Sequence, residues 1–123
     1  ITFTGRIDRL EKNPEGKYEV VDFKSGSSVK SKNKAKIDPQ LNIYAKAVEK
    51  LKGELPVKAS LFYVEKDMMV DYVVSKESVD EAMESIIQMT VEILKENFNS
   101  TPSFQACKFC SYHSICDAKI INE

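Results

Sequence analysis

The sequence predicts an α/β fold in which a mixed β-sheet is flanked by helices. Four segments have the pattern of β-strands, either alternating apolar and polar residues or a short apolar run, and they follow one another in two pairs. Turn residues separate the members of each pair, and a stretch with helical periodicity follows each pair. The order strand, strand, helix, strand, strand, helix is typical of one sheet with helices packed on it. Since 123 residues suit one domain, we expect residues 1–123 to form a single domain, with a cysteine-containing C-terminal segment at 99–123.

The first pair of predicted strands forms a hairpin. Residues 2–11 (TFTGRIDRLE) alternate well enough for one strand, and residues 18–24 (YEVVDFK) make the next. The sequence NPEG at residues 13–16 is typical of the turn between them. SGSS at residues 25–28 ends the second strand, and a lysine-rich loop follows it.

A helix is expected to begin at Asp38-Pro39, because Asp is a favoured N-cap and Pro is favoured at the first helical position. Gly53 suits the exit from this helix. The apolar face of the helix is formed by residues at helical spacing, namely Leu41, Tyr44, Ala45, Val48 and Leu51.

The second pair of strands is predicted at residues 57–65 and 69–75, around a tight Lys66-Asp67 turn. Ser78-Val79-Asp80-Glu81 resembles a capping box and is expected to open a long helix. Residues 99–106 then form a loop before the cysteine segment closes the chain.

Composition and charge limit the kind of protein. Hydrophobic residues make up 42% and charged residues 30% of the chain, which is typical of a globular rather than a disordered protein. The net charge of −1 gives no overall signal for nucleic acid, so a basic surface would have to be local. No apolar run approaches the roughly 20 residues that cross a bilayer, and we expect no membrane partner. Because the first residue is Ile rather than Met, we expect the chain to be a fragment whose upstream residues are missing.

Three cysteines, Cys107, Cys110 and Cys116, crowd near the C-terminus. An odd, clustered set is not typical of the disulfide framework of a secreted protein, so we expect a reducing compartment and a cytoplasmic location. On bare chemistry the three thiolates and His113 could bind zinc, although His113 lies awkwardly between two of the cysteines. Free thiols are a further alternative.

The predicted hairpin carries the residues with the clearest chemistry. Side chains two apart on a strand point the same way, so Asp22 and Lys24 share a face, and a hairpin can place Asp8 beside them. Two close carboxylates repel each other unless a cation lies between them, and a hard ion such as Mg²⁺ prefers oxygen ligands. Lys24 would orient or deprotonate a water, or stabilise charge that develops on a phosphate. Metal, water and cation together describe phosphodiester hydrolysis.

The same charges also have a simpler interpretation. Asp8 would pair with Arg6 or Arg9, and Asp22 with Lys24, as ordinary surface charges. Asp22 and Lys24 nevertheless interrupt an apolar strand that should be largely buried. Charges in such a place are costly unless satisfied, and they cluster at functional sites.

Three motifs in this order resemble the core of the PD-(D/E)xK nucleases of RecB type: Gly5-Arg6-Ile7-Asp8-Arg9, Asp22-Phe23-Lys24-Ser25-Gly26 and Gln40-x-x-x-Tyr44. The resemblance runs from about Gly5 to Cys116. It implies a restriction-endonuclease-like core of the α/β (α+β) class, with a mixed central sheet flanked by helices.

The resemblance also implies roles for single residues. Asp8, Asp22 and the backbone carbonyl of Phe23 become ligands of Mg²⁺ or Mn²⁺, and Lys24 becomes the catalytic lysine. Gln40 and Tyr44 become a pair that faces the active site and the DNA backbone. Without the resemblance, Tyr44 reads as a core residue and Gln40 as a polar residue of a first helical turn.

Two further features bear on cofactors. In many relatives a histidine upstream of the first strand completes the metal site, whereas the single histidine here is His113, so we expect an incomplete metal site.

The spacing Cys107-x2-Cys110-x5-Cys116 resembles the C-terminal trio of an iron–sulfur subgroup, found in AddB-like nucleases and related CRISPR-associated ones. There the trio and a distant upstream cysteine hold a [4Fe–4S] cluster. We expect this cluster in the full-length parent and not in the 123-residue chain.

The lysine-rich loop has two interpretations. Its lysines contact DNA phosphates, or they are solvated on a mobile loop. The lysines in question are Lys30, Lys32, Lys34 and Lys36, of which the first three are the candidate DNA-binding residues.

Three functions therefore compete. The first is a metal-dependent deoxyribonuclease, an exonuclease in preference to an endonuclease, that acts on DNA in repair or recombination together with a helicase domain or subunit. The second is a non-catalytic nuclease-like module that binds DNA or holds a complex together. The third is a zinc-binding scaffold in which the hairpin charges are incidental.

Overall fold

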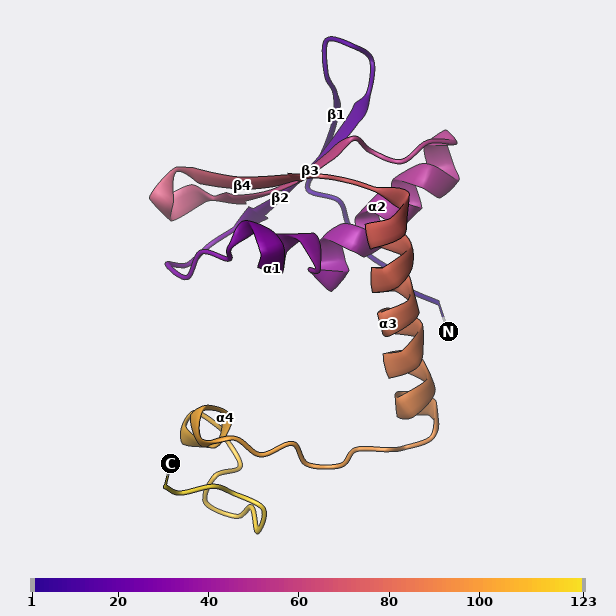
Figure 1. Cartoon of the computed structure of the whole chain (residues 1–123). Coiled ribbons are helices and arrows are strands. Elements are labelled where there is room, and N and C mark those ends of the chain that lie inside the picture. The colour runs from indigo at the N-terminus through magenta and orange to yellow at the C-terminus, as the bar shows by residue number, and fades with distance from the viewer. Residues whose placement is uncertain (1, 123) are drawn as a thin grey trace. The chain divides into compact units, whose positions relative to one another are not determined.

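A four-stranded sheet with the order β1-β2-β3-β4 forms the centre of the computed structural model, which describes residues 2–122 (Figure 1). The strands pair antiparallel (β1 with β2), parallel (β2 with β3) and antiparallel (β3 with β4), so the mixed sheet is confirmed. Their bounds are β1 Arg9–Lys12, β2 Tyr18–Lys24, β3 Lys58–Tyr63 and β4 Met68–Val73.

The parallel pairing of β2 with β3 requires a crossover connection, because two parallel strands cannot be joined by a tight turn. Two helices form it, α1 (Lys32–Lys36) and α2 (Pro39–Lys52). In Figure 1 both lie on the same face of the sheet, where α2 contacts β2 and β3 and α1 contacts β4.

The core lies between α2 and this face of the sheet. It is built from the alternate residues of the strands that point towards the helices, from one stripe of α2 and from Ala35 of α1. Its buried members are Val20, Ala35, Leu41, Tyr44, Val48, Ala59, Leu61, Tyr63 and Tyr72. Leu51, which was predicted on the apolar stripe of α2, is 77% exposed, because it lies in the last turn of the helix.

Both ends of α2 lie where the sequence predicts them. Asp38 is the N-cap, with its side chain accepting from the backbone N–H groups of Gln40 and Leu41, and Pro39 is the first helical residue. Gly53 ends the helix with φ +80°, a left-handed conformation that glycine adopts without strain.

The first strand is shorter than predicted. It begins at Arg9 rather than at residue 2, and residues 2–8 form no strand. The physical reason is that a side chain takes the place of a backbone acceptor. Asp8 Oδ2 accepts the hydrogen bond of the Phe23 backbone N–H at 2.9 Å, so the backbone pairing of the two strands stops there.

Three smaller predictions are also wrong in detail. The lysine-rich loop contains the helix α1, whose N-cap Ser31 accepts from the Lys34 N–H. The predicted strand 57–65 ends early because Val64–Lys66 form a 3-10 turn closed by Asp67 at φ +47°. The helix predicted from Ser78 is α3 (Lys76–Leu94), and the oxygen that caps Ser78 N–H belongs to Ser75.

The chain divides into two compact units, Ile1–Thr90 and Val91–Glu123. The second unit contains the short helix α4 (Phe104–Lys108), capped by Ser103, and a series of turns that carry the cysteines. The expected single domain stays a prediction. None of the helices within residues 2–122 is both long and apolar enough to cross a membrane.

Candidate active site

Asp8 lies where the β1–β2 ladder ends. The last pair of that ladder is Arg9 with Val21, so the next residue back, Asp8, is placed across from Asp22. The two carboxyl groups interact directly: Asp22 lowers the pKa of Asp8, and Asp8 raises the pKa of Asp22. The hairpin therefore brings together the two carboxylates that the sequence singled out.

The Phe23 backbone faces the same edge. Its N–H donates to Asp8, and the N–H and C=O of one strand residue point to the same side of the strand. The Phe23 carbonyl is therefore directed towards the edge that Asp8 occupies, beyond the last pair of the ladder. The Phe23 side chain lies on the other face of the sheet, in edge-to-face contact with Phe62.

Asp22 is a buried carboxylate, with 2% of its surface exposed. It points into the core face beside Leu61, its partner on β3. Its Oδ2 lies 2.7 Å from Lys24 Nζ, yet no donor among the described residues gives that oxygen a hydrogen bond of good geometry. The pair is thus a close electrostatic contact that leaves the carboxylate incompletely satisfied, which is costly in a buried place.

Lys24 is held by a second contact. Its Nζ donates to Gln40 Oε1 at 2.7 Å, and Gln40 Nε2 donates to the Tyr44 hydroxyl at 2.9 Å. Gln40 and Tyr44 are one turn apart on α2, so the helix presents both to the end of β2. Asp22, Lys24, Gln40 and Tyr44 therefore form one continuous chain of polar contacts.

Gly5 explains how Tyr44 reaches this position. A Cβ at Gly5 would meet Tyr44 Cε1 at 3.1 Å, a tight contact, so glycine lets the segment pass close to the ring. Beside it, a cavity of about 320 Å³ is lined by Gln40 and Tyr44 on one side and by residues 3–5 on the other. The end of the polar chain is therefore open to an approaching ligand.

The electrostatics of the site follow from burial and proximity. Burial raises the pKa of Asp22, and the Lys24 ammonium opposes that shift without cancelling it. The bond from the Phe23 N–H, followed by the contact with Asp22, lowers the pKa of the exposed Asp8. Burial acts to lower the pKa of Lys24, but the contact with Asp22 outweighs it, so this pKa is raised. The Lys24 ammonium thus pairs with Asp22 and acts on Asp8 only through its charge.

The simpler interpretation of these charges fits in part, since the Arg6 charge contributes a small lowering of the pKa of Asp8. Arg9, one expected partner of Asp8, pairs with Glu11 at 2.7 Å. Asp22 does pair with Lys24, but the carboxylate is in the interior rather than on the surface.

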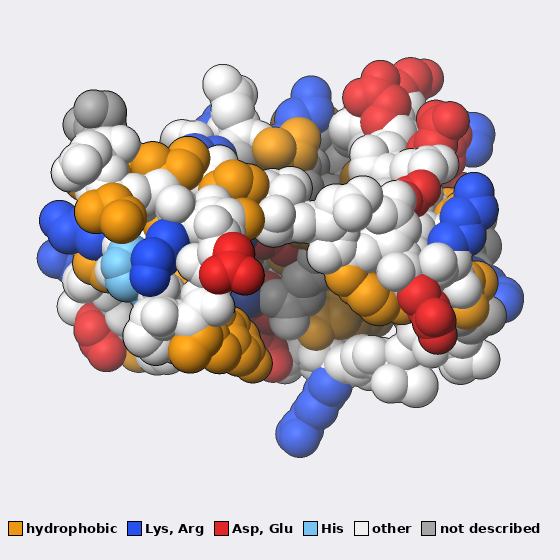
Figure 2. All heavy atoms as spheres, turned by 90° about the horizontal axis from the view of Figure 1, so that it is seen from below, with side chains coloured by type: hydrophobic (Ala, Val, Ile, Leu, Met, Phe, Trp, Pro, Cys, Tyr) orange, Lys and Arg blue, Asp and Glu red, His pale blue; other side chains and the backbone are white. Residues whose placement is uncertain are grey.

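The lysines after β2 are not equivalent. Lys30 is engaged, because its Nζ lies 2.6 Å from Asp38 Oδ2 and its backbone N–H donates to the Tyr63 hydroxyl. Lys32 and Lys34 are exposed on α1. On the face drawn in Figure 2, basic and acidic side chains are scattered among hydrophobic ones.

The cysteines lie together in the second unit. Cys107, Cys110 and Cys116 are free thiols that line one cavity of about 150 Å³. The Ile120 N–H points at Cys107 Sγ and the Tyr112 N–H at Cys110 Sγ, each at 3.4 Å. His113 directs Nδ1 at the Cys107 carbonyl, 2.8 Å away.

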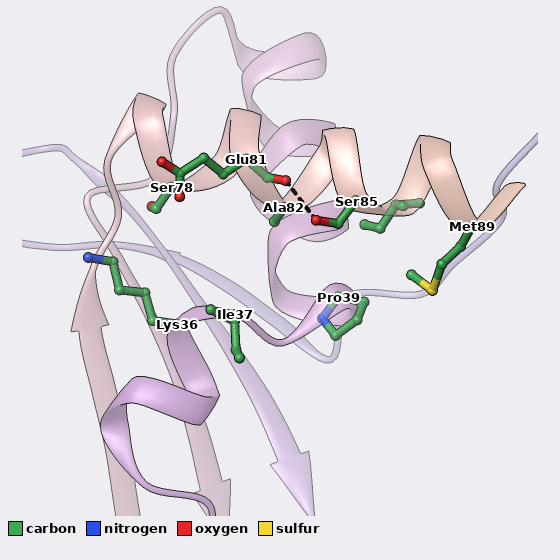
Figure 3. A pocket seen from close by; sticks show the side chains of 9 residues that line it. Lys36, Ile37, Pro39, Ser78, Glu81, Ala82, Ser85 and Met89 are labelled. Atoms are coloured by element: carbon green, nitrogen blue, oxygen red, sulfur yellow. Dashed lines mark hydrogen bonds between the residues drawn. The ribbon is translucent and has the colours of Figure 1, made fainter. Parts of the chain in front are cut away.

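A cavity of about 210 Å³ lies between the start of α2 and α3, but it lacks this kind of chemistry (Figure 3). Its charged residues are Lys36 and Glu81, and Ser85 donates its hydroxyl hydrogen bond to the Glu81 backbone carbonyl. Asp8, Asp22 and Lys24 are not among the residues that line it.

Comparison with known proteins decides the family. The family model described as the PD-(D/E)XK nuclease superfamily matches residues 1–117. The chain belongs to this superfamily. The superfamily fold that the resemblance implied is therefore confirmed, whereas the RecB type and the iron–sulfur subgroup stay predictions.

Two relatives of this superfamily member are longer than the chain itself. The CRISPR-associated exonuclease Cas4 of Saccharolobus solfataricus is 29% identical over 117 residues, which cover 94% of this chain and 52% of the relative. The crystal structure of SSO0001 is 26% identical, with a TM-score of 0.47, and again 94% of this chain and 52% of that one are covered. This chain thus spans about half the length of the curated relative it matches.

The sequence predicted only a helix-capping role for Asp38, whereas the structure also gives it an ion pair. Asp38 is 5% exposed and lies between Lys30 and the first turn of α2. Its cap role was readable, because Asp before Pro is a local signal. Its ion pair was not, because the pairing with Lys30 depends on how the loop packs.

Proposed function

We propose that this chain is the catalytic core of a metal-dependent deoxyribonuclease. The observation that carries the proposal is the meeting of Asp8, Asp22 and Lys24 at the end of the β1–β2 ladder. Membership of a nuclease superfamily, and similarity to a relative named as an exonuclease, support the same class of reaction.

The donors present fit a hard divalent cation such as Mg²⁺ or Mn²⁺. Asp22 offers a buried and incompletely satisfied carboxylate oxygen, Asp8 a second carboxylate, and Phe23 a backbone carbonyl. Within residues 2–122 no group of three or more His, Cys, Asp or Glu side chains is arranged to hold a metal, and this holds for the three cysteines as well as for the two aspartates. The proposed set around Asp8 and Asp22 therefore takes its third oxygen from the Phe23 backbone. When bound, such an ion supplies Lewis-acid activation of a phosphodiester and of a water.

Asp8 keeps one oxygen for this task. Its Oδ2 is committed to the Phe23 N–H, which leaves Oδ1 to face a cation. The same bond fixes the direction of the carboxylate, as second contacts do for metal ligands in general.

Lys24 would hold a water or stabilise negative charge on the phosphate. Gln40 accepts from its ammonium and so limits the directions in which the remaining N–H bonds can point. Tyr44 in turn fixes the Gln40 amide and lines the open cavity beside it, where a DNA strand would approach.

Contacts to the DNA backbone would come from exposed lysines. Lys32 and Lys34 have free access to a phosphate, whereas Lys30 would first have to leave Asp38. Such contacts make binding sensitive to salt.

We further propose that the whole protein is a cytoplasmic exonuclease that works with a helicase in DNA repair or recombination. In it, Cys107, Cys110 and Cys116 would supply three ligands of a [4Fe–4S] cluster. Their shared cavity and the N–H groups directed at two of the sulfurs support this assignment. Zinc bound by the same thiolates is the alternative.

The test of the nuclease function uses the full-length protein with linear and circular DNA. We expect degradation with Mg²⁺ or Mn²⁺ that stops on addition of a chelator. Degradation of linear DNA alone would identify an exonuclease. DNA binding without any cleavage under these conditions would favour the non-catalytic module.

A further inference from the structure

We propose that Asp38 and Lys30 form a positioning pair that holds Gln40 against Lys24. The catalytic consequence of this pair rests on the proposed nuclease function, whereas its structural consequence does not. Asp38 is 5% exposed, and a buried carboxylate persists only where it is paired and hydrogen-bonded. Its contacts therefore indicate what it does.

Both oxygens of Asp38 are occupied. Oδ1 accepts from the backbone N–H groups of Gln40 and Leu41, at 2.9 and 3.2 Å. Oδ2 lies 2.6 Å from Lys30 Nζ, and the Asp38 carbonyl accepts from Asn42 Nδ2 at 2.8 Å. The first turn of α2, which carries Gln40, is thereby fixed in direction by Asp38.

Lys30 is anchored at its other end. Its backbone N–H donates at 2.9 Å to the hydroxyl of Tyr63, a buried residue at the end of β3. The loop that leaves β2 after Lys24 is thus tied to both the sheet and the start of α2.

These contacts close a ring. The chain runs from Lys24 through the loop to Lys30, the ion pair leads to Asp38, and the helix cap leads to Gln40. The hydrogen bond from Lys24 Nζ to Gln40 Oε1 completes the circuit. Breaking the ion pair or the cap should loosen the first turn of α2, which carries the hydrogen-bond partner of Lys24.

The expected effect is on turnover rather than on DNA binding. Misplacement of a reacting group by about 1 Å costs up to about 100-fold in rate, and Gln40 sets the direction of the Lys24 ammonium. A lysine already paired with a buried carboxylate is also a poor phosphate contact. The pair thus predicts that Lys30 acts differently from Lys32 and Lys34.

The experiment compares Asp38→Ala, Asp38→Asn and Lys30→Gln in the full-length protein. For Asp38→Ala we expect kcat to fall about tenfold or more with KM within about twofold, and faster amide hydrogen exchange at Gln40 and Leu41. Asp38→Asn keeps a capping oxygen, so it should restore slow exchange and part of the turnover. Lys30→Gln should lower kcat and leave the salt dependence of DNA binding unchanged.

The matched control is Asp80→Asn, which removes the exposed Lys76–Asp80 pair on α3 and should change neither quantity. Asp38→Ala with wild-type kcat and wild-type exchange would overturn the proposal. So would Lys30→Gln with unchanged kcat, a raised KM and a salt slope reduced by about one, since that is the behaviour of a phosphate contact.

Two outcomes separate this proposal from the function it rests on. If the wild-type protein cuts no DNA, the proposed function fails, while amide exchange still decides whether Asp38 and Lys30 position Gln40. If Asp38→Ala does not fold, Asp38→Asn and Lys30→Gln are judged by the same exchange and turnover measurements.

Discussion

The Gln40 amide oxygen accepts a hydrogen bond from the Lys24 ammonium, with 2.7 Å between Oε1 and Nζ. The two residues lie on different elements, Lys24 at the end of β2 and Gln40 in the first turn of α2. Because Gln40 Nε2 donates to the Tyr44 hydroxyl at 2.9 Å, only one orientation of the amide satisfies both neighbours. A strand end and a helix start are thereby coupled through one side chain.

Asp22 and Lys24 should separate metal binding from turnover. Asp22→Ala removes a proposed ligand, so metal binding and DNA cleavage should be lost together. Lys24→Ala should keep metal binding and lower kcat by about 100-fold, the usual effect of losing one group that stabilises developing charge. Isothermal titration with Mg²⁺ or Mn²⁺ and a cleavage assay measure the two effects. Normal cleavage by Asp22→Ala would end the assignment of activity to this site.

Metal should also stabilise the folded protein. An ion at 100 times its dissociation constant adds about 2.7 kcal/mol to the free energy of unfolding, which raises Tm by several degrees. This gain should be absent in Asp22→Asn and present in Asp80→Asn, whose carboxylate is on the exposed surface of α3. Differential scanning fluorimetry with and without Mg²⁺ measures the shift, and an equal gain in Asp22→Asn would contradict the ligand role.

Asp38 should contribute to stability at acid pH. Burial acts to raise its pKa, but Lys30 and the N–H groups of Leu41 and Gln40 outweigh it and lower the pKa below 3.8. A carboxyl with a lowered pKa stabilises the folded state above its unfolded pKa, and this contribution is lost as pH falls through the folded value. Between about pH 5 and pH 2, the wild type should therefore lose more unfolding free energy than Asp38→Asn does. Urea titrations across this range test the prediction, and equal losses would contradict it.

Tyr72 should limit stability at alkaline pH. Burial, with a smaller contribution from the Asp38 charge, raises the pKa of Tyr72 to about 12. The folded state therefore favours the neutral phenol, and stability should fall as pH rises from about 10 through about 12. Tyr72→Phe should reduce this loss, and the exposed Tyr112→Phe should not.

At neutral pH the same substitution should cost little. The Tyr72 hydroxyl is buried and has no hydrogen-bond partner among the described residues. Its removal should therefore change the free energy of unfolding by less than about 1 kcal/mol. A larger loss would mean that the hydroxyl binds an internal water.

The three cysteines lead to a prediction about the iron content of the full-length protein. The full-length protein, purified without oxygen, should be brown and contain about four irons per chain if the cluster is of the [4Fe–4S] type. Substituting Cys107, which is buried, should remove the iron and the colour. Iron-free protein with stoichiometric zinc would replace the cluster by a zinc site.

Local signals decided which elements could be predicted. Residues 18–24 and the helix from Pro39 to Lys52 were predictable because β-branched and aromatic residues, the Asp-Pro start and the Gly53 exit act within a few residues. Ser31 carried a similar signal for α1, which the surrounding lysines obscured.

Long-range contacts account for what could not be predicted. The alternation of residues 2–11 suits a strand, but the Asp8 carboxylate replaces the backbone partner of Phe23, so the strand starts at Arg9. The Lys30–Asp38 pair is likewise invisible in a sequence, because it depends on the path of the loop. The residues of the site could be selected from the sequence because three short motifs occur in a fixed order. The structure places these residues together, namely Asp8, Asp22, Lys24, Gln40 and Tyr44. Their catalytic roles stay predictions.

The parallel pairing of β2 with β3 determines when, during synthesis, the proposed site can be completed. Every residue of the proposed site leaves the ribosome before β3 does, yet Asp22 is buried beside Leu61, which follows only after the whole crossover. Contacts between such distant segments form slowly, because the intervening chain must first be ordered. During synthesis the nascent hairpin would therefore carry exposed carboxylates, and the low-dielectric surroundings that distinguish Asp22 from Asp8 would arise only once β3 has left the ribosome and paired with β2.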